Sequence, residues 1–159
     1  MATRSKSGSS RVELATPGDA AAIAAMSRDE IERGLGWSWN EARVRRAILN
    51  PDTNAAVIRE NRTIAAFGIM SYRDEAAHLL LFAVRRSQQR RGMGSVILRW
   101  LEEVAQAAGL PRVYVECRRD NVAARNFYGE HGYHEVVISK GYYSGVVDAI
   151  RLEKWLASP

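Results

Sequence analysis

The sequence predicts a single mixed α/β domain. Segments that alternate polar and apolar residues with the period of a strand are interspersed with segments of helical periodicity, and no internal repeat appears. The chain of 159 residues is also about the size at which one substantial core forms. We expect the folded domain to span residues 11–157, because residues 1–10 are small, polar and basic and predict a disordered tail.

The first half of the chain predicts two helices among short strands. Thr16 and Pro17 are typical of a helix start, and Pro51 ends a second helical stretch. The elements expected here are a strand at 11–15, helices at 17–26 and 40–48, and strands at 55–59, 63–72 and 77–84, with a short turn at 60–62.

The second half predicts two more helices. The first, at 93–108, stops at Gly109, with Pro111 just beyond. Its apolar stripe is Val96, Ile97, Trp100, Leu101 and Val104. The remaining expected elements are a strand at 113–118, a helix at 122–131 ended by Gly132, and strands at 133–140 and 146–155.

A glycine-containing basic turn joins the apolar strand at 79–84 to the helix at 93–108. The turn is Gln89-Arg90-Arg91-Gly92-Met93-Gly94-Ser95, and Arg85 and Arg86 precede it. A helix N-terminus carries unpaired N–H groups and partial positive charge, so the pattern favours a phosphate-containing ligand. Neither a nucleoside-triphosphate P-loop nor a dinucleotide fingerprint fits, since Gly-Lys-Ser/Thr and a third glycine at 97 are lacking. An ordinary glycine-bearing turn stays open as the alternative.

A second segment places three functional groups near one another. In the strand at 113–118, Glu116 lies on the polar face and Cys117 on the apolar face. Asn121, Ala124 and Tyr128 fall on one stripe of the next helix, close to where the strand ends. A carboxylate, an amide and a phenol are therefore expected to converge on one cleft.

The two segments resemble the GNAT superfamily of N-acetyltransferases. The turn is similar to its Gln/Arg-x-x-Gly-x-Gly/Ala signature, and the stretch from Glu116 to Tyr128, followed by Gly132-Tyr133, resembles the bacterial enzymes that acetylate the N-terminal alanine of a ribosomal protein. The similarity runs over about residues 12–156. The chain differs at Cys117, where those enzymes commonly have valine, and over residues 34–39.

The resemblance implies an α/β acetyltransferase fold, whose mixed central sheet has splayed strands and is flanked by helices. It also implies acetyl-coenzyme A as cosubstrate and direct attack by a primary amine, with Glu116 as general base and Tyr128 as general acid. The oxyanion donor is expected to be a backbone N–H near Val84. The implied cofactor-binding residues are Phe82, Ala83, Val84, Gln89, Arg90, Arg91, Gly92, Met93, Gly94, Ser95, Asn121 and Ala124.

Each assignment has a structural alternative. Glu116 could form a salt bridge with Arg118 or Arg119, and Tyr128 could be a half-buried helix aromatic. Asn121 could act only as a helix cap. An acyl-enzyme is disfavoured because Cys117, the sole cysteine, lies on the apolar face and is expected to be a buried thiol.

Composition limits the expected cellular location of the protein and the kinds of partner that it can bind. The three histidines have no metal-binding spacing with carboxylates, so we expect no metal. Apolar runs fall short of the roughly 20 residues of a membrane helix, and the N-terminus lacks a secretory signal, which predicts a cytoplasmic protein with no membrane partner. The formal charge of +5 suits a polyanionic cofactor as well as nucleic acid.

Three functions are therefore open. The first is acetylation of a protein N-terminal α-amine, which has a lower pKa than a lysine amine and is deprotonated more easily by a carboxylate. Trp37, Trp39, Tyr142 and Tyr143 could then line the acceptor groove, with local packing of loop aromatics as the alternative. The second is acetylation of a small-molecule amine, and the third is a basic module that binds nucleic acid without catalysis. The oligomeric state is not indicated.

Overall fold

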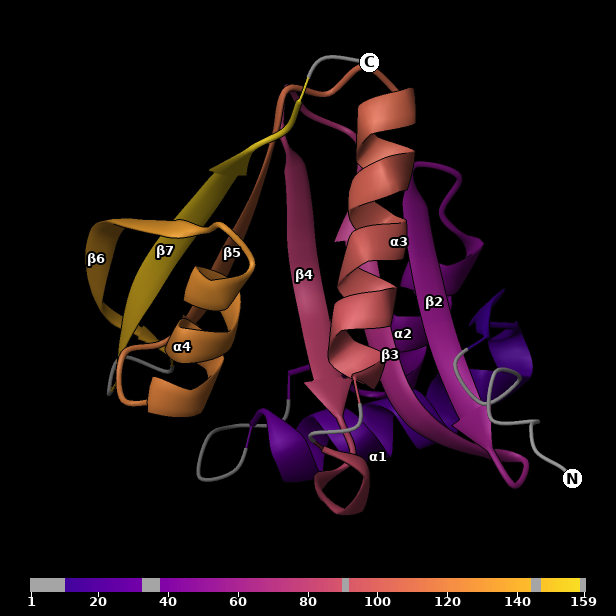
Figure 1. Cartoon of the computed structure of the whole chain (residues 1–159). Helices are drawn as coiled ribbons and strands as arrows, with labels where there is room; N and C mark the ends of the chain where they lie inside the picture. Colours follow the sequence, from indigo (N-terminus) through magenta and orange to yellow (C-terminus); the bar gives the residue numbers. More distant parts are fainter. Residues whose placement is uncertain (1–10, 33–37, 90–91, 144–146, 158–159) are drawn as a thin grey trace, which may run out of the picture.

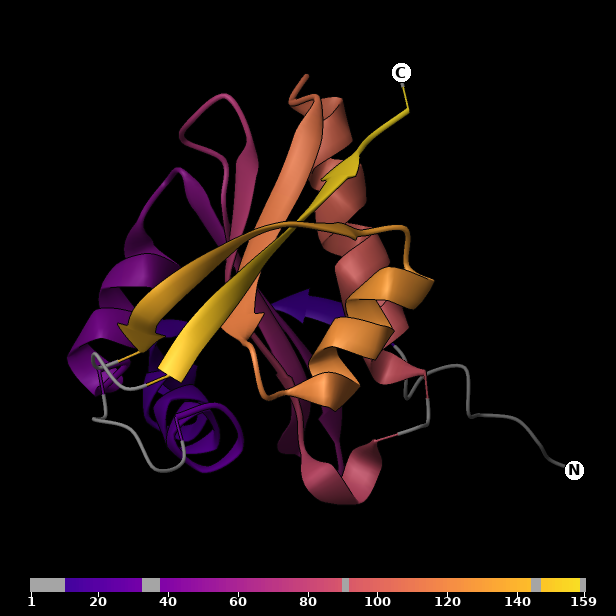
Figure 2. The same cartoon turned by 90° about the vertical axis from the view of Figure 1, so that its left-hand side faces the viewer.

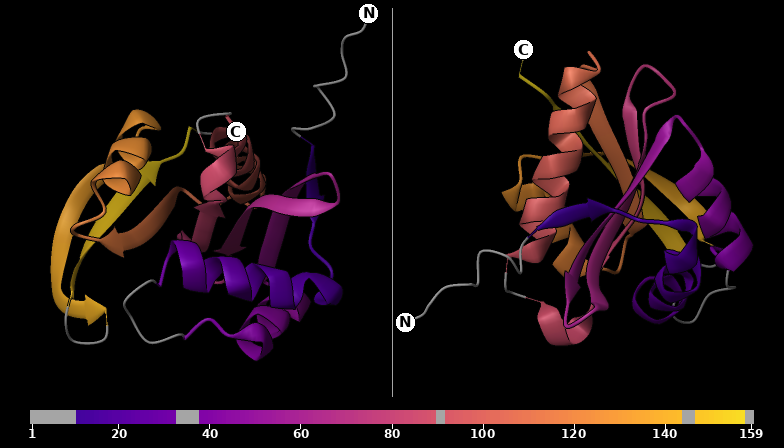
Figure 3. Two further views of the ribbon diagram at one scale, coloured as in Figure 1. Left: turned by 90° about the horizontal axis from the view of Figure 1, so that it is seen from below. Right: turned by 90° about the vertical axis from the view of Figure 1, so that its right-hand side faces the viewer.

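The computed structural model describes residues 11–32, 38–89, 92–143 and 147–157. They form one mixed sheet with the strand order β1-β2-β3-β4-β5-β7-β6. Helices α1 and α2 cover one side of the sheet, and α3 and α4 lie on the other (Figures 1 and 3). The predicted mixed α/β domain with flanking helices is thus confirmed.

The helices and strands follow the predicted order. They are β1 (Val12–Leu14), a 3-10 turn (Pro17–Asp19), α1 (Ala20–Glu30), α2 (Glu41–Leu49), β2 (Thr53–Glu60), β3 (Thr63–Ser71), β4 (Ala77–Val84), a 3-10 turn (Arg86–Gln88), α3 (Met93–Ala107), β5 (Arg112–Arg118), α4 (Val122–Glu130), β6 (His134–Tyr143) and β7 (Val147–Trp155). The first helix begins later than predicted because the residues after Thr16 form a 3-10 turn, in which the Asp19 carboxylate accepts the Thr16 N–H at 2.8 Å.

Turn residues end the elements where the sequence predicts. Asn61 and Arg62 both have positive φ, which suits the tight connection between β2 and β3. Gly109 follows α3 with φ of 83°, and Gly132 follows α4 with φ of 90°. Both glycines occupy the left-handed conformation that commonly closes a helix.

The sheet separates two clusters of buried side chains. On the α3 side the helix buries Ile97, Leu98, Leu101 and Ala105 completely. The predicted stripe is therefore displaced by about one residue, and Trp100 packs at its margin. On the α1 and α2 side, the residues Ile23, Val44, Phe67 and Ile69 form the second cluster. In the described part of the chain, no helix is long and apolar enough to cross a membrane.

The sheet opens between β4 and β5. These parallel strands pair only from Ala77 to Leu79, opposite Val113 to Val115. Beyond this point they diverge, as Figure 1 shows. β5 instead pairs with β7 along its whole length, so that β5, β7 and β6 form a separate wing next to α4 (Figure 2). The splayed strands expected from the resemblance are present.

The packing of α3 gives a stability prediction. Leu101→Ala should lower the free energy of unfolding by about 2–5 kcal/mol, because it leaves a cavity at a fully buried position. Leu49→Ala is the matched control, since Leu49 is 64% exposed and its loss should change stability by less than about 0.5 kcal/mol. Urea denaturation of both variants measures the difference. Equal stabilities would contradict the assignment of α3 to the core.

Candidate active site

A cleft of about 1330 Å³ follows the opening between β4 and β5. Its walls come from the end of α1, α2, β4, the start of α3, β5 and α4. The register between β3 and β4 shifts at Leu80, so this residue has no partner in β3. From Leu80 to Val84, the edge of β4 facing β5 has no strand pairing in the described residues. Backbone groups along this edge can therefore bind an extended ligand.

The N-terminus of α3 opens onto the cleft. The internal hydrogen bonds of α3 begin with the Val96 N–H, which donates to the Gly92 carbonyl, so the N–H groups of Met93, Gly94 and Ser95 lie outside the helical ladder. The first turn carries no acidic residue. This end of the helix is thus suited to an anion.

Glycine suits the two positions in the turn for different structural reasons. Gly92 has φ of 82° and no atom within 4 Å of the position that a Cβ would take. Gly94 is buried, and a Cβ there would approach Phe82, Val84 and Phe127 at 3.3 Å. Gly92 leaves open space above the helix terminus, whereas Gly94 lets α3 pack closely on β4 and α4.

Polar side chains in and just before the turn form hydrogen bonds with backbone carbonyls of the protein. The Gln89 amide donates to the Val84 carbonyl at 3.1 Å, and the Arg85 guanidinium donates to the Ile64 carbonyl. The Gln89 side chain therefore holds the turn to the end of β4. Arg90 and Arg91 lie outside the described residues.

Ser95 connects α3 to α4 through His131. The Ser95 hydroxyl lies 2.8 Å from Nε2 of His131, and Nδ1 of the same ring lies 2.7 Å from the Phe127 carbonyl. Because a carbonyl only accepts, Nδ1 carries a proton, and in the neutral imidazole Nε2 then accepts from the serine. The Ser95 side chain thus positions the two helix ends that border the cleft.

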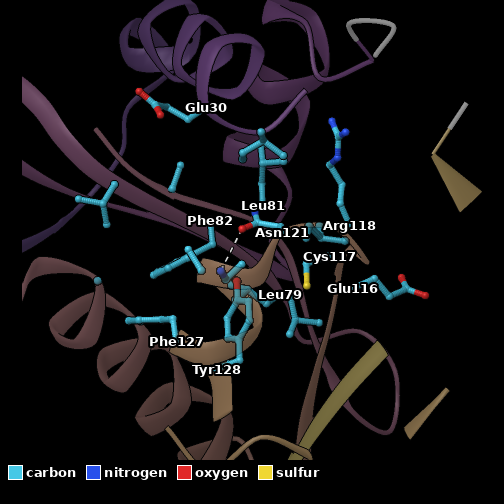
Figure 4. A pocket seen from close by; sticks show the side chains of 18 of the residues that line it. Glu30, Leu79, Leu81, Phe82, Glu116, Cys117, Arg118, Asn121, Phe127 and Tyr128 are labelled. Atoms are coloured by element: carbon cyan, nitrogen blue, oxygen red, sulfur yellow. Dashed lines mark hydrogen bonds between the residues drawn. The ribbon is translucent and has the colours of Figure 1, made fainter. Parts of the chain in front are cut away.

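Aromatic side chains of α4 pack against β4 beside the opening. The Phe127 and Phe82 rings stack with centroids 5.5 Å apart, and Phe82 lies 6.1 Å from Tyr128. Val84 faces the same side, whereas Ala83 is buried on the side of α1. Tyr128 is only 5% exposed, and its hydroxyl points into the cleft (Figure 4).

Asn121 serves as the N-cap of α4. Its side-chain oxygen accepts the Ala124 N–H at 3.0 Å (Figure 4), as the structural alternative predicts. Both Asn121 and Ala124 line the cleft. The capping bond uses one lone pair of the amide oxygen, which leaves the second lone pair and the NH₂ group for a ligand.

Glu116 lies on the other face of β5 from Cys117. Glu116 and Tyr128 both line the cleft, but they approach it from opposite sides of the sheet (Figure 4). The carboxylate is 15% exposed, and its Oε1 lies 3.6 Å from Nε2 of His78. Arg118 and Arg119, the partners considered from the sequence, form ion pairs with Asp120 and Asp148.

Glu32 is a cleft residue that the sequence analysis did not predict. Glu32 is buried beside the end of α1, where it accepts hydrogen bonds from Ser27, Ser38 and the Trp39 N–H. Burial with several donors is the environment that a carboxylate requires away from water. Glu32 therefore holds the segment after residue 37 against the cleft.

Of the aromatic residues predicted to line an acceptor groove, the structure describes the side chain of Trp39. It is half-buried, and the Arg43 guanidinium lies 4.0 Å from its ring centroid. Trp37 and the side chains of Tyr142 and Tyr143 lie outside the described residues. Among those described, no three His, Cys, Asp or Glu side chains form a metal-ligating group.

Comparisons with known proteins agree with this geometry. The model of the acetyltransferase (GNAT) family matches residues 21–133. The [ribosomal protein bS18]-alanine N-acetyltransferase of Escherichia coli K12 is 32% identical over 96 residues, which cover 58% of this chain and 65% of the relative. The enzyme of the same name from Salmonella typhimurium is 34% identical over 90 residues, covering 55% of this chain and 61% of the relative. The match thus spans less than two thirds of either relative's length.

Solved structures share the fold over nearly the whole chain. The crystal structure of the ribosomal-protein-S18-alanine N-acetyltransferase from Escherichia coli gives a TM-score of 0.77 at 24% identity, covering 94% of this chain and 95% of that one. The PaiA N-acetyltransferase from Thermoplasma acidophilum, solved in complex with coenzyme A, gives 0.78 at 14% identity, covering 92% and 98%.

The burial of Cys117 gives a prediction about reactivity. Burial raises the pKa of this thiol to about 11, so at pH 8 almost all of it is in the neutral, unreactive form. We expect iodoacetamide to label the native protein about 10²-fold more slowly than the urea-unfolded protein, whose thiol has a pKa of about 8.5. Intact-mass spectrometry follows the labelling of this sole cysteine. Equal rates would restore Cys117 as a candidate nucleophile.

Proposed function

Because the chain belongs to the acetyltransferase (GNAT) family, we propose that it transfers an acetyl group from acetyl-coenzyme A to the N-terminal α-amine of a protein. The observation that carries the proposal is the cleft between β4 and β5, with an anion-binding helix terminus at its edge and Glu116 and Tyr128 on its opposite walls. Family membership favours this enzyme over a nucleic-acid-binding module.

The residues at the cleft fit coenzyme A. Its pyrophosphate would bind the N–H groups at the start of α3, above the open space at Gly92. The extended pantetheine arm would lie along the unpaired edge of β4, near Phe82 and Val84. Acetyl-coenzyme A supplies the activated thioester.

Glu116 and Tyr128 would divide the proton transfers between them. An amine attacks a thioester only after it has lost its extra proton, and Glu116 would accept that proton. Tyr128 would donate a proton to the departing sulfur from the other side of the sheet. This arrangement supports direct transfer, because the one cleft offers both a proton acceptor and a proton donor.

The acceptor class follows from the relatives and from amine chemistry. The relatives are named for the alanine of ribosomal protein bS18, which supports a protein N-terminus as acceptor. An α-amine, with a pKa of about 7.7–8.0, is also easier to deprotonate at neutral pH than an ordinary lysine, with a pKa of about 10.4. A small-molecule amine is the second candidate.

A panel of acceptors tests the proposal. It contains an alanine-initiated peptide copied from the host's bS18 N-terminus, the same peptide with a blocked α-amine, alanine amide and spermidine. We expect transfer to the free peptide α-amine, located by tandem mass spectrometry, and none to the blocked peptide. Rapid acetylation of spermidine without any peptide product would support the small-molecule alternative.

The turn before α3 gives a prediction about coenzyme A binding. Gly92→Glu places a negative charge at the proposed pyrophosphate site and should weaken coenzyme A binding at least about tenfold. Gly109→Glu is a matched control at the other end of α3, because Gly109 also has positive φ and open space around it. The two variants should lose similar stability, on the order of 1–2 kcal/mol. Titration calorimetry would contradict the proposed site if folded Gly92→Glu bound coenzyme A with wild-type affinity.

Removal of the Tyr128 hydroxyl tests the proposed general acid. Tyr128→Phe keeps the ring, so turnover should fall by about 10²–10⁴-fold while coenzyme A affinity stays the same. Tyr133→Phe is the matched control, because its buried hydroxyl donates to Glu102 at 2.7 Å and its loss should reduce stability rather than turnover. Steady-state kinetics and thermal melts separate the two effects. Unchanged turnover in Tyr128→Phe would return this residue to a packing role.

A further inference from the structure

His78 is a half-buried histidine beside Glu116 that the proposed mechanism does not use. The parallel pairing of β4 and β5 aligns His78 with Tyr114, and their rings stack with centroids 4.2 Å apart. This stacking holds Nε2 of the imidazole 3.6 Å from Oε1 of Glu116. Both side chains line the cleft, and His78 is the more exposed of the two, at 25% against 15%.

Charged groups surround this pair on the neighbouring strands. Arg151 of β7 lies opposite Glu116, and its guanidinium sits 3.8 Å from the Tyr114 ring centroid while it also binds Glu153. Burial is the largest influence on His78 and lowers its pKa, an effect that Arg151 reinforces, whereas Glu116 and Asp74 act to raise it. His78 is therefore neutral at pH 7 and can accept a proton.

The base strength of an isolated carboxylate is poorly matched to this reaction. A glutamate with a pKa of about 4.3 must take a proton from an α-ammonium with a pKa of about 7.7–8.0, whereas an imidazole has a pKa of about 6.5. General base catalysis is most effective when the pKa of the base lies near the working pH. A histidine beside the glutamate is a second group that can accept the proton, and the Glu116 charge partly offsets the lowering of the His78 pKa by burial.

We propose that Glu116 and His78 act as one proton-accepting pair. This inference rests on the proposed function and identifies where the proton goes. The N–H bond of the substrate ammonium breaks as the Glu116 carboxylate takes the proton, which then passes to Nε2 of His78. Glu116 is again a carboxylate beside an imidazolium, and the His78 side chain, which is 25% exposed, can release the proton to water. His78 acts through Glu116 and is therefore a positioning residue.

The coupling between the two side chains can be measured without substrate. We expect the NMR pKa of His78 to be lower in Glu116→Gln than in the wild type, because the variant removes the negative charge that favours the imidazolium. The signal is assigned by its loss in His78→Gln. The other two histidines, His131 and His134, account for the remaining imidazole signals. An unchanged His78 pKa would overturn the pair.

Kinetics test whether the pair works as a unit. His78→Gln should lower kcat at least about tenfold and move the acidic limb of its pH profile to lower pH, since a carboxylate alone then accepts the proton. Coenzyme A affinity should stay the same. His134→Gln, an exposed histidine on β6, is the matched control and should match the wild type. Wild-type kcat and an unmoved limb in His78→Gln would overturn the inference.

A double variant tests whether His78 and Glu116 share one role in proton acceptance or act independently. His78→Gln with Glu116→Gln should be no slower than Glu116→Gln alone, because the proton reaches His78 only through Glu116. Losses that multiply would contradict the relay. Absence of any acetyl transfer by the wild-type protein would instead contradict the proposed function, and the NMR titration would still decide whether the pair exists.

Discussion

The separation of β4 and β5 is the constraint on which the site depends. Two parallel strands that stay paired leave no space between them, yet here the pairing ends at Leu79 and Val115. Aromatic contacts take its place on one side, where Phe82 of β4 packs against Phe127 and Tyr128 of α4. On the other side, β5 completes its hydrogen bonding with β7. Beyond this point β4 pairs with β3 and β5 pairs with β7, and the other edge of β4 is left for a ligand.

The same constraint determines where the chemical groups lie. Side chains of a strand alternate between its faces, so Glu116 and the neighbouring Cys117 leave β5 in opposite directions. Cys117 packs with Tyr128 in the core on the α3 side, whereas Glu116 approaches His78 on the other face. A proposed proton acceptor and proton donor thus reach one cleft from different faces of the sheet. A thioester between the strands would be accessible from both sides.

Local sequence signals predict most of the helices and strands, whereas the splayed sheet is implied only by the family resemblance. β4 at Ala77–Val84 and the start of α3 at Met93 occur where predicted, because alternation, glycine and helical periodicity act over a few residues. The unpaired position of Leu80 was not predicted, since register depends on contacts between distant strands. The contact of His78 with Glu116 was missed for the same reason. Side-chain bonds are also poorly indicated by sequence, as the internal contacts of Gln89 and Ser95 illustrate.

The most direct test of this account is a crystal structure of the protein with coenzyme A. We predict that the pyrophosphate lies on the N–H groups of Met93, Gly94 and Ser95, that the pantetheine arm follows β4 between the two strands, and that the thiol lies within hydrogen-bond distance of the Tyr128 hydroxyl. Coenzyme A bound outside the cleft, or with its thiol far from both Tyr128 and Glu116, would contradict the account.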